Sequence, residues 1–266
     1  MKNCLTIAGS DCSGGAGIQA DIKTFCANGV YAMSVITSVV AENTSRVLNV
    51  YDLPTQVIEQ QIDAVFEDIE VDGVKIGMIK SCEIMNSVAN KLIQYRPLNV
   101  VVDPVMSAKD NHSLMNQNAL QTLKEKILPL TTMLTPNIPE AEMLTGISIK
   151  NTDDIYACAK IIYDMGAKNV LIKGGHSKYK PTDILYDGVK FYEFTSERIN
   201  TKNTHGTGCT LSSAITANLS KGLQAKDAVL NAKKYIYNTI KNSLEIGKGN
   251  GPLHHFYDYY NTKGFD

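Results

Sequence analysis

Short apolar segments rich in β-branched residues alternate along this chain with longer segments whose apolar residues recur at helical spacing. The short segments are typical of buried strands and the long ones of amphipathic helices, so the alternation predicts a mainly parallel sheet between layers of helices. The expected strands cover residues 4–8, 30–40, 74–79, 100–103, 133–135 and 169–173. The expected helices cover residues 18–26, 54–69, 84–95, 119–128, 136–144 (entered from a strand end), 153–165, 211–219 and 225–244. Residues 183–194 predict a β-hairpin at the sheet edge, because strand residues flank an Asp-Gly turn.

Length and composition exclude several classes of protein. A chain of 266 residues without a repeat or low-complexity linker fits one domain over residues 1–266. The net charge of −1 and dispersed basic residues argue against a nucleic-acid partner. No apolar run approaches the roughly 18 residues of a membrane-spanning helix, and the apolar core of residues 1–9 is too short for a signal peptide. The six cysteines form no C-x-x-C pair, which indicates reduced thiols. Together with the charge and the missing signal peptide, this predicts a cytoplasmic protein that binds small molecules.

Residues 203–213 (NTHGTGCTLSS) place glycines and hydroxyl side chains directly before a predicted helix. Glycine lets backbone amides approach a ligand closely, and the first turn of a helix offers unpaired N–H groups and the positive end of the dipole. Gly206 and Gly208 therefore predict an anion site, and the same dipole should favour the thiolate of Cys209. A phosphate site with a potential base inside it indicates phosphoryl transfer, although an ordinary glycine loop before a helix would show the same pattern.

A second glycine turn, residues 9–17 (GSDCSGGAG), joins the first expected strand to the first expected helix. The turn lacks the Gly-Lys-Ser/Thr ending of a Walker A loop and the spacing of a dinucleotide fingerprint. Its glycines still indicate close approach of the backbone to a ligand. Polar residues 41–44 end the next strand, where side chains would line a pocket.

Polar side chains also follow later strands, and ligands of parallel sheets bind beyond the carboxyl ends of strands. Asp103 and Lys173 are well placed there, and Lys173 could meet a phosphate. Asn137 and Glu140 can share one face of a helix's first turn and hold a hydrated Mg²⁺, although a helix start favours both residues anyway. Asp103 could likewise only cap the turn before Pro104.

Two further positions carry a weaker signal. His176 is expected to be a loop histidine. Lys233 and Lys234 are expected on a solvated helix face, from which one lysine could approach the phosphates of ATP.

Five motifs occur in one order: AGSDCSGGAGIQAD at 8–21, DPVM at 103–106, TPNIPEAE at 135–142, KGGH at 173–176 and NTHGTGCT at 203–210. Together they resemble the hydroxymethylpyrimidine and phosphomethylpyrimidine kinases of thiamine biosynthesis, within the ribokinase superfamily, from about residue 3 to 255. The Gly-Thr-Gly-Cys form separates this branch from sugar kinases, which carry an aspartate where Cys209 stands.

The resemblance implies a ribokinase-like three-layer α/β/α sandwich, a homodimer, and two successive ATP-dependent phosphorylations of 4-amino-5-hydroxymethyl-2-methylpyrimidine. It implies an anion hole at Gly206, Thr207 and Gly208, with Cys209 as the base toward the substrate hydroxyl. It implies that Asn137 and Glu140 organise Mg²⁺. It implies ATP contacts at Asp103, Asn137, Lys173, Thr207 and Lys234, and pyrimidine contacts at Gly9, Asp21, Glu42, Met78 and Val105.

One residue departs from the family pattern. Members of the family have glutamine where this chain has Glu42, and an ionised glutamate only accepts hydrogen bonds. We expect Glu42 to accept from the 4-amino group of the pyrimidine and to share a proton with the adjacent ring nitrogen. The alternatives are a pyridoxal or pyridoxine kinase, which would differ around Glu42, Met78 and Val105, and a non-catalytic nucleotide- or pyrimidine-sensing protein.

Overall fold

The computed structural model describes residues 1–106, 116–175 and 181–264, so that His176 lies outside the described residues. Within these ranges nine strands form one sheet in the order β3-β2-β1-β4-β5-β6-β7-β8-β9. The strands are β1 (Asn3–Asp11), β2 (Tyr31–Glu42), β3 (Val47–Asp52), β4 (Gly73–Ile76), β5 (Val100–Val102), β6 (Met133–Leu134), β7 (Val170–Ile172), β8 (Thr182–Tyr186) and β9 (Phe191–Thr195). The strands β2, β1, β4, β5, β6 and β7 run parallel to one another. Antiparallel pairs close both edges of the sheet: β3 pairs with β2 at one edge, and at the other edge β8 pairs with β7 and with β9. The predicted mainly parallel sheet is therefore confirmed.

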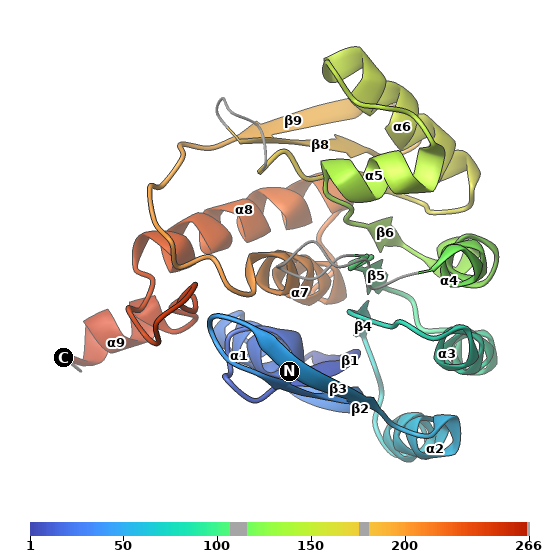
Figure 1. Ribbon diagram of the computed structural model, residues 1–266, viewed down its shortest axis with the longest axis horizontal. Helices are drawn as coiled ribbons and strands as arrows, with labels where there is room; N and C mark the ends of the chain where they lie inside the picture. The colour runs from blue at the N-terminus through green and yellow to red at the C-terminus, as the bar shows by residue number, and fades with distance from the viewer. Residues whose placement is uncertain (107–115, 176–180, 265–266) are drawn as a thin grey trace.

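Helices cover both faces of this sheet, which gives the predicted three layers (Figure 1). On one face lie α2 (Thr55–Phe66), α3 (Cys82–Tyr95), α4 (Gln117–Thr122), α5 (Ile138–Thr145) and α6 (Thr152–Asp164). On the other face lie α1 (Gly17–Ala27), α7 (Thr207–Ser220) and α8 (Ala225–Lys241), and α9 (Tyr257–Lys263) follows near the C-terminus. None of the helices in the described ranges combines the length and apolarity that crossing a bilayer requires.

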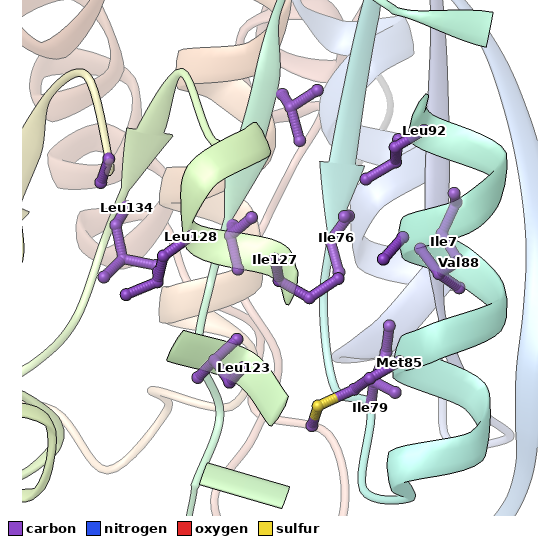
Figure 2. Close-up of a cluster of buried hydrophobic side chains, with 14 of the residues drawn as sticks. Ile7, Ile76, Ile79, Met85, Val88, Leu92, Leu123, Ile127, Leu128 and Leu134 are labelled. Atoms are coloured by element: carbon purple, nitrogen blue, oxygen red, sulfur yellow. The ribbon is translucent and has the colours of Figure 1, made fainter. Parts of the chain in front are cut away.

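The central strands β5, β6 and β7 are apolar throughout because both of their faces are buried. Successive side chains of a strand point to opposite faces. Val100 and Val102 of β5 accordingly pack in the larger apolar cluster, whereas Val101 packs with α7 and α8. Figure 2 shows the larger cluster, in which Ile76 lies between side chains of α3 and Ile127.

The sequence did not predict β3, and it predicted one helix over residues 119–128. Most β3 side chains are exposed, so the strand lacks the apolar run that marks buried strands. The predicted helix is α4 followed by a π-helical turn (Leu123–Ile127) and a 3-10 turn (Leu128–Leu130) that holds Pro129. The hairpin of β8 and β9 is confirmed, with the Asp187 side chain accepting from the amides of Val189 and Lys190.

Candidate active site

The N-terminus of α7 lies at the carboxyl ends of the parallel strands. Gly206 precedes the helix with a φ of 82°, and a Cβ on it would lie 1.8 Å from the carbonyl oxygen of Gly15, so only glycine fits there. Among the described residues, the amides of Gly208 and Cys209 have no hydrogen-bond acceptor in the protein. Unpaired amides at the start of a helix bind anions, so this turn has the properties of the predicted anion hole.

Two pockets meet at this turn. The β2 pocket, of about 350 Å³, extends from the turn to the end of β2, and the α8 pocket, of about 410 Å³, extends from it along α8. Both volumes lie in the range of small-molecule sites. The pockets share one wall, made of Asn137, Lys173, Thr204, Thr207 and Gly208. Two ligands could therefore occupy the two pockets and meet at the anion hole.

The β2 pocket brings together most of the residues predicted to contact the pyrimidine. The structure places four of them in its lining, Gly9, Glu42, Met78 and Val105, beside Gly206 and Cys209 of the predicted catalytic turn. Asp21 is the exception, because it is fully buried behind the pocket wall. Its carboxylate accepts hydrogen bonds from the hydroxyls of Thr6 (2.6 Å) and Ser213 (2.8 Å) and from Lys75 Nζ (2.8 Å). The predicted direct contact of Asp21 with substrate is therefore wrong, since its oxygens are engaged inside the protein.

Lys75 was not among the residues predicted from the sequence. It is fully buried on β4 and its side chain lies at the base of the β2 pocket. Burial disfavours the ammonium form, but the negative charges of Asp21, Cys209 and Asp103 together outweigh it, and the pKa of Lys75 is raised. The sequence did contain a signal, because a lysine inside the apolar run 74–79 needs a buried anionic partner.

Cys209 borders the β2 pocket and is half-buried. Burial raises the pKa of its thiol to about 11, the charge of Lys75 opposes that rise, and the carboxylates of Asp21 and Asp103 add to it. Burial therefore works against the thiolate that the position of Cys209 at the start of α7 predicts.

The wall between the pockets carries an ion pair and a capping box. Lys173 Nζ lies 2.7 Å from Asp103 Oδ1. Asn137 and Glu140 cap α5, with each side chain accepting a hydrogen bond from the other's backbone amide. Glu140 is 5% exposed, and burial raises its pKa to about 7, with Lys173 opposing the rise and Asp103 adding to it. These acidic and basic groups face the position where two ligands would meet.

The α8 pocket receives a different lysine from the one predicted. Lys234 is exposed and does not line the pocket, so the structure does not bring this residue to the site. Lys233, one residue earlier, lines the pocket and lies 2.8 Å from Asp183 Oδ2. Farther from the anion hole the lining becomes more apolar, with Ile236, Tyr237 and Ile240.

Asp11, Glu42 and His205 form a cluster at the β2 pocket, with potential ligand atoms within 4.8 Å of one another. The carboxylate of Asp11 accepts from Ser13, from the amides of Gly15 and Ala16, and contacts His205 Nε2 at 2.7 Å. Burial opposes ionisation of Asp11, but these contacts hold its pKa low. With its oxygens engaged, Asp11 ties the glycine turn to the segment before α7.

A nucleotide-sized pocket, a second pocket and an anion hole between them, on a sheet of this order, define a kinase of small molecules with a ribokinase-like fold. The family described as phosphomethylpyrimidine kinase matches residues 11–254. The chain belongs to this family, which confirms the predicted resemblance and makes the protein a phosphotransferase.

Individual relatives agree. The hydroxymethylpyrimidine/phosphomethylpyrimidine kinase of Bacillus subtilis is 47% identical over 258 residues, covering 96% of this chain and 95% of the relative. The thiamine biosynthesis bifunctional protein ThiED of Geobacter sulfurreducens is 47% identical over 94% of this chain, and the chain spans 51% of that protein.

Solved structures of two kinds are similar. The phosphomethylpyrimidine kinase of Clostridium difficile has a TM-score of 0.82 and 46% identity, covering 90% of this chain and 100% of that one. The ADP complex of the Bacillus subtilis pyridoxal kinase has a TM-score of 0.90 and 40% identity, covering 98% of this chain and 100% of that one.

Proposed function

We propose that this protein uses ATP to phosphorylate 4-amino-5-hydroxymethyl-2-methylpyrimidine to its monophosphate and then to the diphosphate, for thiamine biosynthesis. The observation that carries the proposal is the pair of pockets that meet at the start of α7. The relatives named as hydroxymethylpyrimidine/phosphomethylpyrimidine kinases support the choice of substrate.

In this proposal ATP occupies the α8 pocket and the pyrimidine occupies the β2 pocket. The adenine end of ATP lies toward Ile236 and Ile240, and its phosphates lie toward Lys233 and Lys173. The amides of Gly208 and Cys209 then donate to the oxygens of the transferring phosphoryl group. Positioning and charge neutralisation of this kind supply most of the catalysis of phosphoryl transfer.

The first transfer needs a base. The hydroxymethyl oxygen bonds to the γ-phosphorus as the bond from phosphorus to the bridging oxygen breaks, ADP leaves, and the hydroxyl proton passes to the Cys209 thiolate. In the second transfer the attacking oxygen belongs to a phosphate that is already anionic near pH 7. We therefore expect Cys209→Ala to lose far more of the first phosphorylation than of the second. Equal losses would indicate that the thiol positions ligands or binds anions instead.

The residues at the shared wall fit a hydrated Mg²⁺. Asn137 and Glu140 border the β2 pocket next to the Asp103 and Lys173 pair, but Glu140 Oε2 and the single side-chain oxygen of Asn137 already accept the capping bonds. Mg²⁺ keeps several waters and binds through few protein oxygens, so these residues would hold it mainly through water. When bound, the ion neutralises charge on the ATP phosphates. Asn137 and Glu140 orient its water ligands in this proposal.

Glu42 is proposed to recognise the aminopyrimidine ring. Its carboxylate lies at the end of β2, close to the Asp11 and His205 pair. We propose that Glu42 accepts from the 4-amino group and shares a proton with the adjacent ring nitrogen, which restores a two-point contact. Glu42→Gln should then change the pH dependence of pyrimidine affinity. The shared proton is refuted if that affinity stays the same at every pH.

The experiment that tests the function measures ADP release with Mg²⁺ and ATP and, separately, the hydroxymethylpyrimidine, its monophosphate, and pyridoxal. Turnover of both pyrimidines with little turnover of pyridoxal is expected. The similarity to pyridoxal kinases makes pyridoxal the second candidate substrate. Strong turnover of pyridoxal with none of the monophosphate would overturn the proposed substrate and leave the phosphoryl-transfer site in place.

We also propose a cytoplasmic homodimer whose subunits each form one catalytic domain. Apolar side chains on β2 and β3 are exposed, namely Val39 (46%), Val47 (38%), Leu48 (60%) and Tyr51 (60%). A second copy would bury them. Leu48→Glu should give monomers in sedimentation velocity, whereas Val189→Glu, on the distant hairpin of β8 and β9, should not. A wild-type monomer would refute the dimer.

A further inference from the structure

Lys75 places a positive charge at the base of the β2 pocket. The reaction steps proposed above assign no role to this charge. The Lys75 side chain is fully buried, and Asp21 Oδ2 is its hydrogen-bond acceptor among the described residues. An ammonium group has three N–H donors, so two of them have no acceptor within the described part of the protein. A Cβ on Gly77 would lie 2.7 Å from Lys75 Nζ, so glycine at this position leaves the space that the ammonium occupies.

The pair of Lys75 and Asp21 is also fixed relative to α7. Ser213 donates to Asp21 Oδ1 at 2.8 Å, and Ser213 lies four residues after Cys209, so both side chains project from the same face of the helix. Thr6 of β1 holds the other oxygen of Asp21. The network therefore fixes the rotation of α7 relative to Lys75, and Cys209 and Lys75 both line the β2 pocket.

We propose that Lys75 is a positioning residue for this reaction, whose ammonium group supplies the positive charge beside which Cys209 loses its proton. The inference rests on the proposed function, because it assumes that Cys209 acts as the base. Once the thiolate has formed, it accepts the hydroxyl proton of the pyrimidine as the oxygen bonds to the γ-phosphorus and ADP leaves. Lys75 stays protonated throughout.

The charges around Cys209 support this role. The groups that face the thiol are Lys75 from β4, Asp21 from α1, Asp103 after β5 and Lys173 after β7. Lys173 is paired with Asp103, and both carboxylates oppose ionisation of the thiol. Lys75 is the strongest influence that favours the thiolate. A stabilising role alone does not explain a buried ion pair, because well-packed apolar residues of similar volume are often at least as stable.

The test is the pH dependence of alkylation of Cys209 by iodoacetamide, followed by peptide mass spectrometry so that the other cysteines do not contribute. Only the thiolate reacts, and loss of a nearby opposite charge shifts a pKa by one unit or more. Lys75→Met should therefore slow the alkylation of Cys209 by roughly tenfold or more at pH 8. Ser213→Ala removes a hydrogen bond of the network but no charge, and it should keep the wild-type pH profile.

Asp21→Asn is the reciprocal variant and covers the case in which Lys75→Met does not fold. It removes the carboxylate that keeps the buried Lys75 protonated, so Lys75 should lose its charge and alkylation of Cys209 should become slower, though less than in Lys75→Met because a negative charge facing the thiol is removed as well. Slowing by both substitutions, with an unchanged profile for Ser213→Ala, supports the proposal. An unchanged profile for either folded variant, or equal slowing by Asp21→Asn and Ser213→Ala, would overturn it.

Turnover gives a second readout. Lys75→Met should slow the first phosphorylation by roughly tenfold more than the second, because only the first needs the thiolate. Equal loss of both would overturn the proposed role. Alkylation needs no substrate, so it tests Lys75 even if the wild-type protein fails to phosphorylate the pyrimidine, an outcome that would instead refute the proposed function.

Discussion

His255→Gln should make the protein less sensitive to acid. His255 follows α8 and is 4% exposed, and its Nε2 lies 3.0 Å from the hydroxyl of Thr210, the residue directly after Cys209. The imidazole thus joins the C-terminal segment to the helix that carries the anion hole. Glutamine places an amide near the position of Nε2 but has no group that titrates in this range.

The size of the stability loss in acid follows from the pKa of the His255 side chain. Burial, together with the smaller effect of the charges of Lys23 and His254, lowers the pKa of His255 from 6.5 to about 3. The unfolded chain therefore takes up a proton below pH 6.5 while the folded protein does not. The stability contributed by the neutral imidazole is present above pH 6.5 and is lost as the pH falls toward 3. Between pH 7 and pH 5 this loss amounts to about 2 kcal/mol of unfolding free energy.

The assay is urea denaturation of the wild type and His255→Gln at pH 7 and pH 5. The wild type should lose about 2 kcal/mol more than the variant between these two pH values, and other titrating groups cancel in the comparison. Thr210→Val removes the hydroxyl but keeps the imidazole, so it should be less stable at both pH values and keep the pH dependence of the wild type. Equal losses for the wild type and His255→Gln would refute the argument.

Three further predictions concern the candidate site. Lys233→Met should raise the KM for ATP about tenfold, whereas Lys234→Met should leave it unchanged, because only the first lysine lines the α8 pocket. Gly206→Ala should destabilise the fold by at least about 2 kcal/mol in urea denaturation, since its φ is 82° and its Cβ would overlap Gly15. Gly208→Ala should remain folded, because Gly208 lies within α7, and should lose turnover in the ADP-release assay. Wild-type turnover in Gly208→Ala would contradict a close approach of phosphate to this turn.

The sequence predicted the buried strands and the glycine turn of α7 because each depends on local pattern. Periodicity reports burial, as Val100 to Val102 illustrate, and glycine reports the positive φ at Gly206. β3 could not be predicted in the same way, since an exposed edge strand has no apolar face to reveal it.

The errors at the site arose where a residue's role depends on partners distant in sequence. Asp21 and Lys75 are 54 residues apart, and their motifs alone do not reveal that they pair. Cys209 was assigned a thiolate from its position on the helix, but neighbouring elements bury it. The sequence could have distinguished Lys233 from Lys234, because Val229, Ala232 and Ile236 mark the buried side of α8 and Lys233 lies four residues after Val229 on that side.

The two pockets also explain why kinases of two different vitamins have similar structures. The groups that handle phosphate, among them Lys173, Thr207 and Gly208, lie on the wall that both pockets share and contact no part of the acceptor ring in the proposed arrangement. Glu42 and Met78 line the β2 pocket but not the α8 pocket. We therefore expect substitutions at these two positions, at the end of β2 and after β4, to change the preference between a pyrimidine and pyridoxal without disturbing the anion hole.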